Sequence, residues 1–297
     1  MKHKADAVVL TGRERPAMER PPHTAARLTY VRADSALNRR YVAPGAELNT
    51  GSYEERAVSI ANARLIDLPG GYDENGFALV HHRSAISDLR DPAVLSGAYL
   101  REMEEVVQKV TGADKVIAFS ALVRDVGNPG NGAQPAGTDV HTDFTPRRGA
   151  QAAKAFLAGS DEPDFRCRRF EAINLWRALS PAPQNMPLAV CDGRSIGDGE
   201  GIANTMIRVA TLPGPDEIDR PLSEAERQFE ASLFPYSDGQ RWFYYPDMTR
   251  DELLMFRIFD SRRTGAWRTP HAAFVDESVA HPVPRVSVEA RTFAYFR

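Results

Sequence analysis

Residues 241–274, RWFYYPDMTRDELLMFRIFDSRRTGAWRTPHAAF, contain three apolar and aromatic runs that alternate with turn-like segments. The runs are RWFYY (241–245), LLMFRIFD (253–260) and HAAF (271–274). Aromatic and β-branched residues favour strands, and runs of about four to eight residues have the usual length of a strand. This pattern of runs predicts a mainly β structure in the C-terminal part of the chain.

The same pattern extends outward over residues 116–296. The further strand-length runs are VIAFSALVR (116–124), TDVHTDF (138–144), RFEAINLW (169–176), PLAVCD (187–192), TMIRVA (205–210) and VSVEARTFAYF (286–296). Two helices are expected among them, at 150–157 and at 223–232, where Ser223 and Glu226 form a capping box. Many short strands without βαβ alternation predict a β-sandwich or jelly roll with flanking helices.

Upstream of residue 116 the chain has a mixed character. Residues 63–68 and 76–81 are expected to form short strands on either side of a Pro-Gly-Gly turn. A helix is expected over 96–111, because apolar residues recur there at helical spacing and Gly112 follows as a helix terminator.

We expect a single domain over residues 29–297. Within it, a helical and mixed part would cover 29–115 and a jelly-roll core would cover 116–297. Residues 1–28 contain three prolines and several charges, which predicts a polar N-terminal arm.

Composition excludes several classes of protein. Hydrophobic residues make up 42% of the chain and charged residues 26%, with a formal net charge of -3, so no strong field attracts nucleic acid or an anionic membrane. No long apolar segment marks a signal peptide or a membrane span. The two cysteines, Cys167 and Cys191, form no CxxC pair, which argues against a thiolate zinc site. These features predict a cytoplasmic location and leave open whether the protein forms a homo-oligomer.

The segment His141-Thr142-Asp143 contains two candidate metal ligands. Residues two apart in a strand point to the same face, so this imidazole and this carboxylate can bind one cation together. A second histidine would complete a facial triad of two histidines and one carboxylate, which is typical of non-heme iron(II) oxygenases. Such a ligand should come from a later strand, which leaves His271 and His281, and we favour His271 because it enters a predicted strand.

A cosubstrate such as 2-oxoglutarate also needs a cation for its distal carboxylate, and arginine binds carboxylates with two parallel donors. In the last predicted strand, Arg285, Ser287, Glu289 and Arg291 alternate onto one face. The pair Arg285 and Ser287 is a donor set suited to one carboxylate, and Arg291 is the alternative. The alternative interpretation of this pattern is structural. The segment would then be a half-exposed strand in which Glu289 forms a salt bridge with an arginine.

With these residues identified, the chain resembles the CmcJ/AsaB-like oxidoreductases, which include gibberellin desaturase-like proteins. The resemblance covers residues from about 30 to the C-terminus. The segments that carry it include HisThrAspPheThrPro (141–146), IleAsnLeuTrpArgAlaLeu (173–179), ProHisAlaAlaPhe (270–274) and ProArgValSerValGluAlaArg (284–291).

The resemblance implies a cupin-like double-stranded β-helix that uses iron(II), 2-oxoglutarate and dioxygen. It implies His141, Asp143 and His271 as ligands and Arg285 or Arg291 as the cosubstrate anchor. Asn174 and Arg177 fall in a matched segment and would form a wall of the site or make structural hydrogen bonds.

The reaction implied is hydroxylation, desaturation or another oxidative rearrangement of a small organic molecule, as in secondary metabolism. The alternatives are a metal-dependent isomerase or hydrolase on a jelly roll, and a binding module without catalysis.

Overall fold

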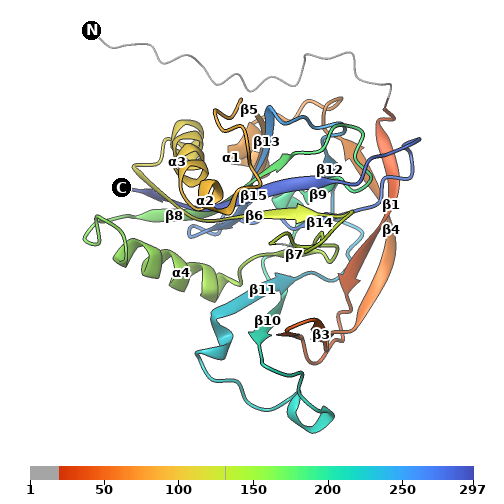
Figure 1. The fold of residues 1–297 in the computed structure, drawn as a ribbon, viewed down its shortest axis with the longest axis vertical. Coiled ribbons are helices and arrows are strands. Elements are labelled where there is room, and N and C mark those ends of the chain that lie inside the picture. The colour runs from red at the N-terminus through yellow and green to blue at the C-terminus, as the bar shows by residue number, and fades with distance from the viewer. Residues whose placement is uncertain (1–19, 131) are drawn as a thin grey trace.

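The computed structural model describes residues 20–130 and 132–297, which form two β-sheets with helices packed against the smaller one (Figure 1). Most of the polar arm expected over residues 1–28 lies outside the described residues. From His23 onward the chain already forms β1, a strand of the larger sheet, so the sheet begins before residue 29.

The smaller sheet has five antiparallel strands in the order β5-β13-β8-β15-β6. Their bounds are β5 (Phe77–His81), β6 (Lys115–Asp125), β8 (Arg169–Ala178), β13 (Glu252–Asp260) and β15 (Val286–Phe296). Successive side chains point to opposite faces of a sheet. In β8, Ala172 and Trp176 belong to one apolar cluster, whereas Ile173 and Leu175 belong to another. Both faces of this sheet are therefore buried.

The larger sheet has ten strands in the order β1-β4-β12-β9-β14-β7-β11-β10-β2-β3. Their bounds are β1 (His23–Val31), β2 (Arg39–Ala43), β3 (Ala46–Asn49), β4 (Tyr53–Asn62), β7 (His141–Thr142), β9 (Leu188–Cys191), β10 (Ile202–Arg208), β11 (Phe229–Leu233), β12 (Trp242–Tyr244) and β14 (His271–Ala273). The N–H of Val140 donates to the carbonyl of Thr29 at 2.9 Å. This bond joins β1 to the residue before β7, so the sheet curls over a third apolar cluster that contains Val140 and Trp242.

The helices are α1 (Gly71–Asn75), α2 (Pro92–Leu95), α3 (Ala98–Thr111) and α4 (Pro146–Ala158), with short 3-10 turns at Gly193–Ser195, Pro215–Glu217 and Glu226–Gln228. Three of the helices, α1, α2 and α3, cover the outer face of the smaller sheet, whereas α4 packs with the cluster on its other face. Met103 and Val107 of α3 pack into the cluster on the outer face of the smaller sheet. Gly112 ends α3 with a φ of 68°, which favours glycine. The predicted helix and its terminator are confirmed to within two residues.

The expected fold class is confirmed: the structure is mainly β, with a jelly roll of two facing sheets and flanking helices. Every strand-length run identified between residues 116 and 296 contains a strand. The helix expected at 150–157 is the core of α4.

Two local predictions are wrong. Residues 63–68 form turns after β4 rather than a strand. The capping box at Ser223 is present, with its hydroxyl 2.8 Å from a Glu226 carboxylate oxygen, but it starts only one 3-10 turn. Phe229–Leu233 then pairs with β10 and with His141 and Thr142 of β7. Pairing on both edges outweighs the local preference for a helix in this segment.

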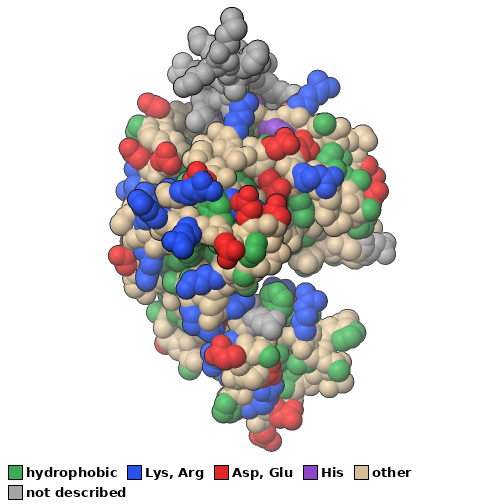
Figure 2. All heavy atoms as spheres, turned by 90° about the vertical axis from the view of Figure 1, so that its left-hand side faces the viewer, with side chains coloured by type: hydrophobic (Ala, Val, Ile, Leu, Met, Phe, Trp, Pro, Cys, Tyr) green, Lys and Arg blue, Asp and Glu red, His purple; other side chains and the backbone are tan. Residues whose placement is uncertain are grey.

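Charges of both signs are interspersed on the face that carries α3 and α4 (Figure 2), as the small net charge implies. Among the helices of the described residues, none has both the length and the apolar character needed to cross a membrane.

A buried ion network fixes α1 against the outer face of the smaller sheet. Arg257 Nη2 lies 3.2 Å from Glu171 Oε1, and both side chains are almost completely buried. Glu171 also accepts a hydrogen bond of 2.8 Å from the Tyr72 hydroxyl, and the Arg257 guanidinium lies 4.5 Å from the centre of the Tyr72 ring. Arg169 also contacts Glu171, so removing Arg257 leaves this buried carboxylate with one cation in place of two.

We therefore expect Arg257→Met to lower the free energy of unfolding by about 3 kcal/mol, measured by urea denaturation. The control is Arg27→Met, which breaks an ion pair to Glu55 whose side chains are 64% and 61% exposed. Exposed pairs contribute less than about 1 kcal/mol. Equal losses in the two variants would contradict a stabilising role for the buried network.

Candidate metal centre

Two short neighbouring strands bring the predicted ligands together. In the pairing of β14 with β7, His271 lies directly opposite His141, and the two ring centres are 4.4 Å apart. Asp143 follows β7 by one residue. The ligand atoms of His141, Asp143 and His271 all lie within 4.8 Å of one another. The alternative ligand, His281, is exposed and has a φ of 58° in a loop, away from this group.

Backbone carbonyls orient both imidazoles. His141 Nδ1 lies 2.7 Å from the carbonyl oxygen of Asp139, and His271 Nδ1 lies 3.3 Å from that of Thr269. A carbonyl oxygen only accepts, so these contacts place the ring proton on Nδ1 and leave the Nε2 lone pair for a cation. Burial and the neighbouring His141 lower the pKa of His271 to about 3, which keeps this imidazole neutral at physiological pH.

Asp143 is held by two side chains of the smaller sheet. Asn174 Nδ2 donates to Oδ2 at 2.6 Å, and Arg291 donates to Oδ1 from Nη2 at 3.0 Å and to Oδ2 from Nε at 3.3 Å. Burial by itself raises the pKa of the carboxyl, but the charge of Arg291 and the hydrogen bond from Asn174 lower it below its ordinary value. The group therefore combines two imidazoles with one ionised carboxylate, the donor set that suits a divalent transition metal.

Arg285 and Ser287, near the metal group, each have a buried hydrogen-bond donor that no described residue uses. Arg285 lines a narrow cavity together with His141 and His271. Its Nη1 donates to the carbonyl of Met186 at 2.7 Å, but its Nε and the Ser287 hydroxyl are buried without a hydrogen-bond partner among the described residues. Burial, and then the nearby Arg124, lower the pKa of Arg285 to about 9. A buried cation with unused donors fits a carboxylate ligand.

Arg177 does not reach this cavity. It lies three residues after Asn174 in β8 and so points to the opposite face of the sheet. Its guanidinium donates to the carbonyl of His82 at 2.9 Å and to that of Arg250. The interpretation of Arg177 as a wall of the site is therefore corrected to a structural hydrogen-bond role.

Six further residues line this cavity: Arg124, Gly137, Trp176, Leu188, Ala273 and Glu289. The Gly-rich loop before His141 gives a signal for Gly137, and the alternating face of the last strand gives one for Glu289. The aromatic character of Trp176 favours the core, and this residue contributes to both the core and the cavity.

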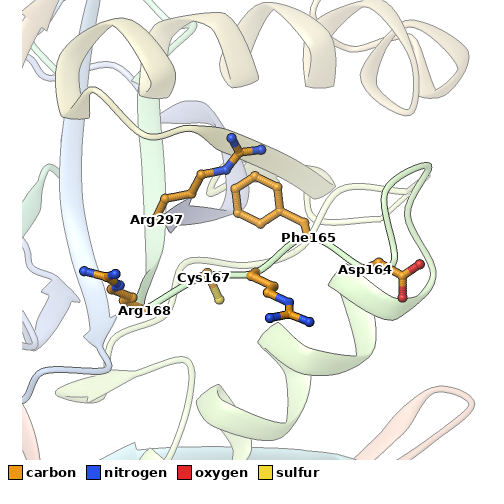
Figure 3. A pocket seen from close by; sticks show the side chains of 6 residues that line it. Asp164, Phe165, Cys167, Arg168 and Arg297 are labelled. Carbon is orange, nitrogen blue, oxygen red and sulfur yellow. The ribbon is translucent and has the colours of Figure 1, made fainter.

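A second hollow lies at the opposite end of β8 and β15 (Figure 3). It is lined by Asp164, Phe165, Arg166, Cys167, Arg168 and Arg297. Arg297 stacks over the Phe165 ring at 4.8 Å, and the three arginines are exposed. Water solvates these arginines, so this hollow lacks the buried, unpartnered donors of the first cavity.

Comparisons with known proteins agree on one family. A model described as "Oxidoreductase/YMDC permease-like domain" matches residues 28–295. The chain is 31% identical over 260 residues to "Hydroxylase/desaturase CTB9" of Cercospora beticola, covering 82% of this chain and 78% of that protein. It is 30% identical to "Fe(II)/2-oxoglutarate-dependent dioxygenase nvfI" of Aspergillus novofumigatus, covering 69% of each. A solved structure of the iron and alpha-ketoglutarate-dependent endoperoxidase NvfI shares the fold, with a TM-score of 0.76 and 24% identity over 93% of this chain and 98% of that chain.

Gly137 approaches the His141 ring so closely that a side chain would disturb it. A Cβ added at Gly137 would lie 3.2 Å from His141 Cε1. We expect Gly137→Ala to tilt the ring and weaken Co(II) binding on the order of 10-fold, measured by isothermal titration calorimetry. In the control, Gly199→Ala, the added Cβ meets nothing within 4 Å. Unchanged affinity in Gly137→Ala would show that the ring position does not limit binding.

The lowered pKa of His271 also predicts a pH dependence of stability. The unfolded chain binds a proton at this histidine near pH 6.5, whereas the metal-free native chain does so only near pH 3. The unfolded state therefore binds more protons between these values, and the free energy of unfolding falls as the pH is lowered. Between about pH 7 and pH 5, we expect the free energy of unfolding to fall less in His271→Gln than in the wild type, measured by urea denaturation. Parallel curves for the two proteins would contradict this assignment.

Proposed function

This chain belongs to the oxidoreductase family that includes these hydroxylase/desaturases and Fe(II)/2-oxoglutarate-dependent dioxygenases, and we propose that His141, Asp143 and His271 bind its iron(II). The resemblance expected from the sequence is confirmed, and with it the activity of a non-heme iron(II)/2-oxoglutarate-dependent dioxygenase. Its cofactor and cosubstrates are accordingly iron(II), 2-oxoglutarate and dioxygen.

The observation that supports the ligand assignment is the donor set itself. Two imidazoles and one ionised carboxylate meet at one point, with their ligand atoms within 4.8 Å of one another. An iron(II) ion held by these three residues would keep coordination positions for a 2-oxo acid and dioxygen. When bound, iron(II) supplies the activation of dioxygen and the oxidation of the substrate. The chain positions the ligands and excludes water.

Arg285 and Ser287 are proposed to bind the distal carboxylate of 2-oxoglutarate. Both are buried, both have an unused donor, and Arg285 shares the cavity with the two histidines. The Trp176 ring lies under the guanidinium, 5.5 Å from its centre, and restrains its orientation. A carboxylate placed here would compensate the charge of Arg285 and accept the unused hydrogen bonds.

The substrate is proposed to be a small organic molecule that is hydroxylated, desaturated or oxidatively rearranged, in a cytoplasmic enzyme. The "Hydroxylase/desaturase" names of the relatives support this range of outcomes. Residues 29–297 are proposed to act as one oxygenase domain. The support for this is the larger sheet, in which β2 pairs with β10 and β4 pairs with β12 of the C-terminal part.

Anaerobic titration with iron(II) and 2-oxoglutarate tests this function. We expect a weak visible charge-transfer band in the wild type, no band in Asp143→Ala or His271→Ala, and succinate release coupled to oxygen uptake with the true substrate. Arg285→Gln should raise the 2-oxoglutarate concentration at half-saturation by at least about 30-fold, because it removes one partner of a buried ionic contact.

The control for the arginine variant is Arg166→Gln, which changes an exposed arginine of the second hollow and should leave the titration unchanged. A flat spectrum in the wild type would contradict the ligand assignment. Normal 2-oxoglutarate affinity in Arg285→Gln would contradict the anchor assignment alone.

A further inference from the structure

Four charged side chains of alternating sign run from the metal group along the cavity wall. Arg291 Nη2 lies 3.0 Å from Asp143 Oδ1 and 2.7 Å from Glu289 Oε1. Glu289 Oε2 in turn lies 3.7 Å from Arg124 Nε. The order Asp143, Arg291, Glu289, Arg124 therefore pairs each charge with one of opposite sign.

This chain of charges is shielded from water. The side chain of Glu289 is 5% exposed, that of Asp143 13% and that of Arg291 21%. Charges in such surroundings interact more strongly than surface pairs, and they are costly to bury unless they are paired. Arg291 is therefore committed to its two carboxylate neighbours, whereas Arg285 has no ion pair among the described residues.

We propose that Arg291, held in place by Glu289, is a positioning residue for the metal-binding carboxylate of Asp143 and does not bind the cosubstrate. This inference rests on the proposed function, since it needs Asp143 to be a metal ligand. Arg285, directly before β15, and Arg291, within β15, then have different roles. Arg285 binds a ligand that enters the cavity, whereas Arg291 orients a ligand that belongs to the chain.

The contacts of Asp143 explain why such a residue is needed. Asp143 lies beyond the end of β7, so the strand pairing does not hold its backbone. Two donors from Arg291 and one from Asn174 fix the rotation of the carboxylate. A lone arginine there would also repel the metal, and Glu289 offsets that charge. Partners behind a metal ligand typically contribute about 10-fold to 100-fold to metal affinity.

Matched substitutions of the two arginines test this difference in role. The probes are Co(II), titrated into the metal-free full-length protein by calorimetry and visible spectroscopy, and then 2-oxoglutarate at saturating Co(II). We expect Arg291→Gln to weaken Co(II) binding about 10-fold to 100-fold, to alter the Co(II) d–d spectrum and to leave 2-oxoglutarate affinity within about 3-fold. We expect Arg285→Gln to show the reverse pattern.

Two further variants keep the test decisive. Should Arg291→Gln fail to fold, Arg291→Lys retains the charge without the paired donors, and we expect it to lose part of the Co(II) affinity. Glu289→Gln should weaken Co(II) binding less than Arg291→Gln. The double variant should lose no more than Arg291→Gln alone, because the two residues act through one contact.

Loss of 2-oxoglutarate affinity with normal Co(II) binding in Arg291→Gln would overturn the inference and make Arg291 the anchor. Unchanged Co(II) affinity and an unchanged spectrum would also overturn it. Failure of the wild type to bind Co(II) would instead contradict the proposed function, so the two failures are distinguishable.

Discussion

The pairing of β7 with β14 is the contact on which the rest of the site depends. The two strands contain only two and three residues, yet both lie in the middle of the ten-stranded sheet, with β11 on one side and β9 on the other. The backbone ladder therefore sets the distance between His141 and His271. Their carbonyl contacts then fix the ring tautomers, and the smaller sheet supplies the groups that hold Asp143.

The cavity between the sheets is polar in a place where most side chains are apolar. Burying a charge is costly unless it is paired, and Asp143, Arg291 and Glu289 satisfy that condition within the chain. Arg285 has no such ion pair among the described residues, and its guanidinium meets the Met186 carbonyl and the Trp176 ring. One buried cation without an ion-pair partner beside a set of metal-ligand donors links the energetics of the fold to the binding of an anionic cosubstrate.

Much of this arrangement could be predicted from local sequence patterns. The spacing of His141 and Asp143 needs only the two-residue period of a strand, and His271 is the better placed of two downstream histidines. The strands between residues 116 and 296 are evident because their apolar runs end at turns. The helix predicted over 223–232 is wrong because a capping box is a local signal, whereas the pairing of β11 with β10 and β7 involves residues distant in sequence.

The partners of Asp143 could not be predicted in the same way. Asn174 and Arg291 lie opposite each other in the pairing of β8 with β15, a register that no local pattern specifies. The opposite direction of Arg177 follows from its odd spacing to Asn174, but only once the face of Asn174 is known.

Anomalous diffraction at the iron edge, on crystals grown without oxygen in iron(II) and 2-oxoglutarate, would locate the bound metal. We expect one strong peak within coordination distance of His141, Asp143 and His271, with the distal carboxylate of 2-oxoglutarate on Arg285. A peak at other side chains, or no peak among these three residues in iron-saturated crystals, would show that they do not bind the iron.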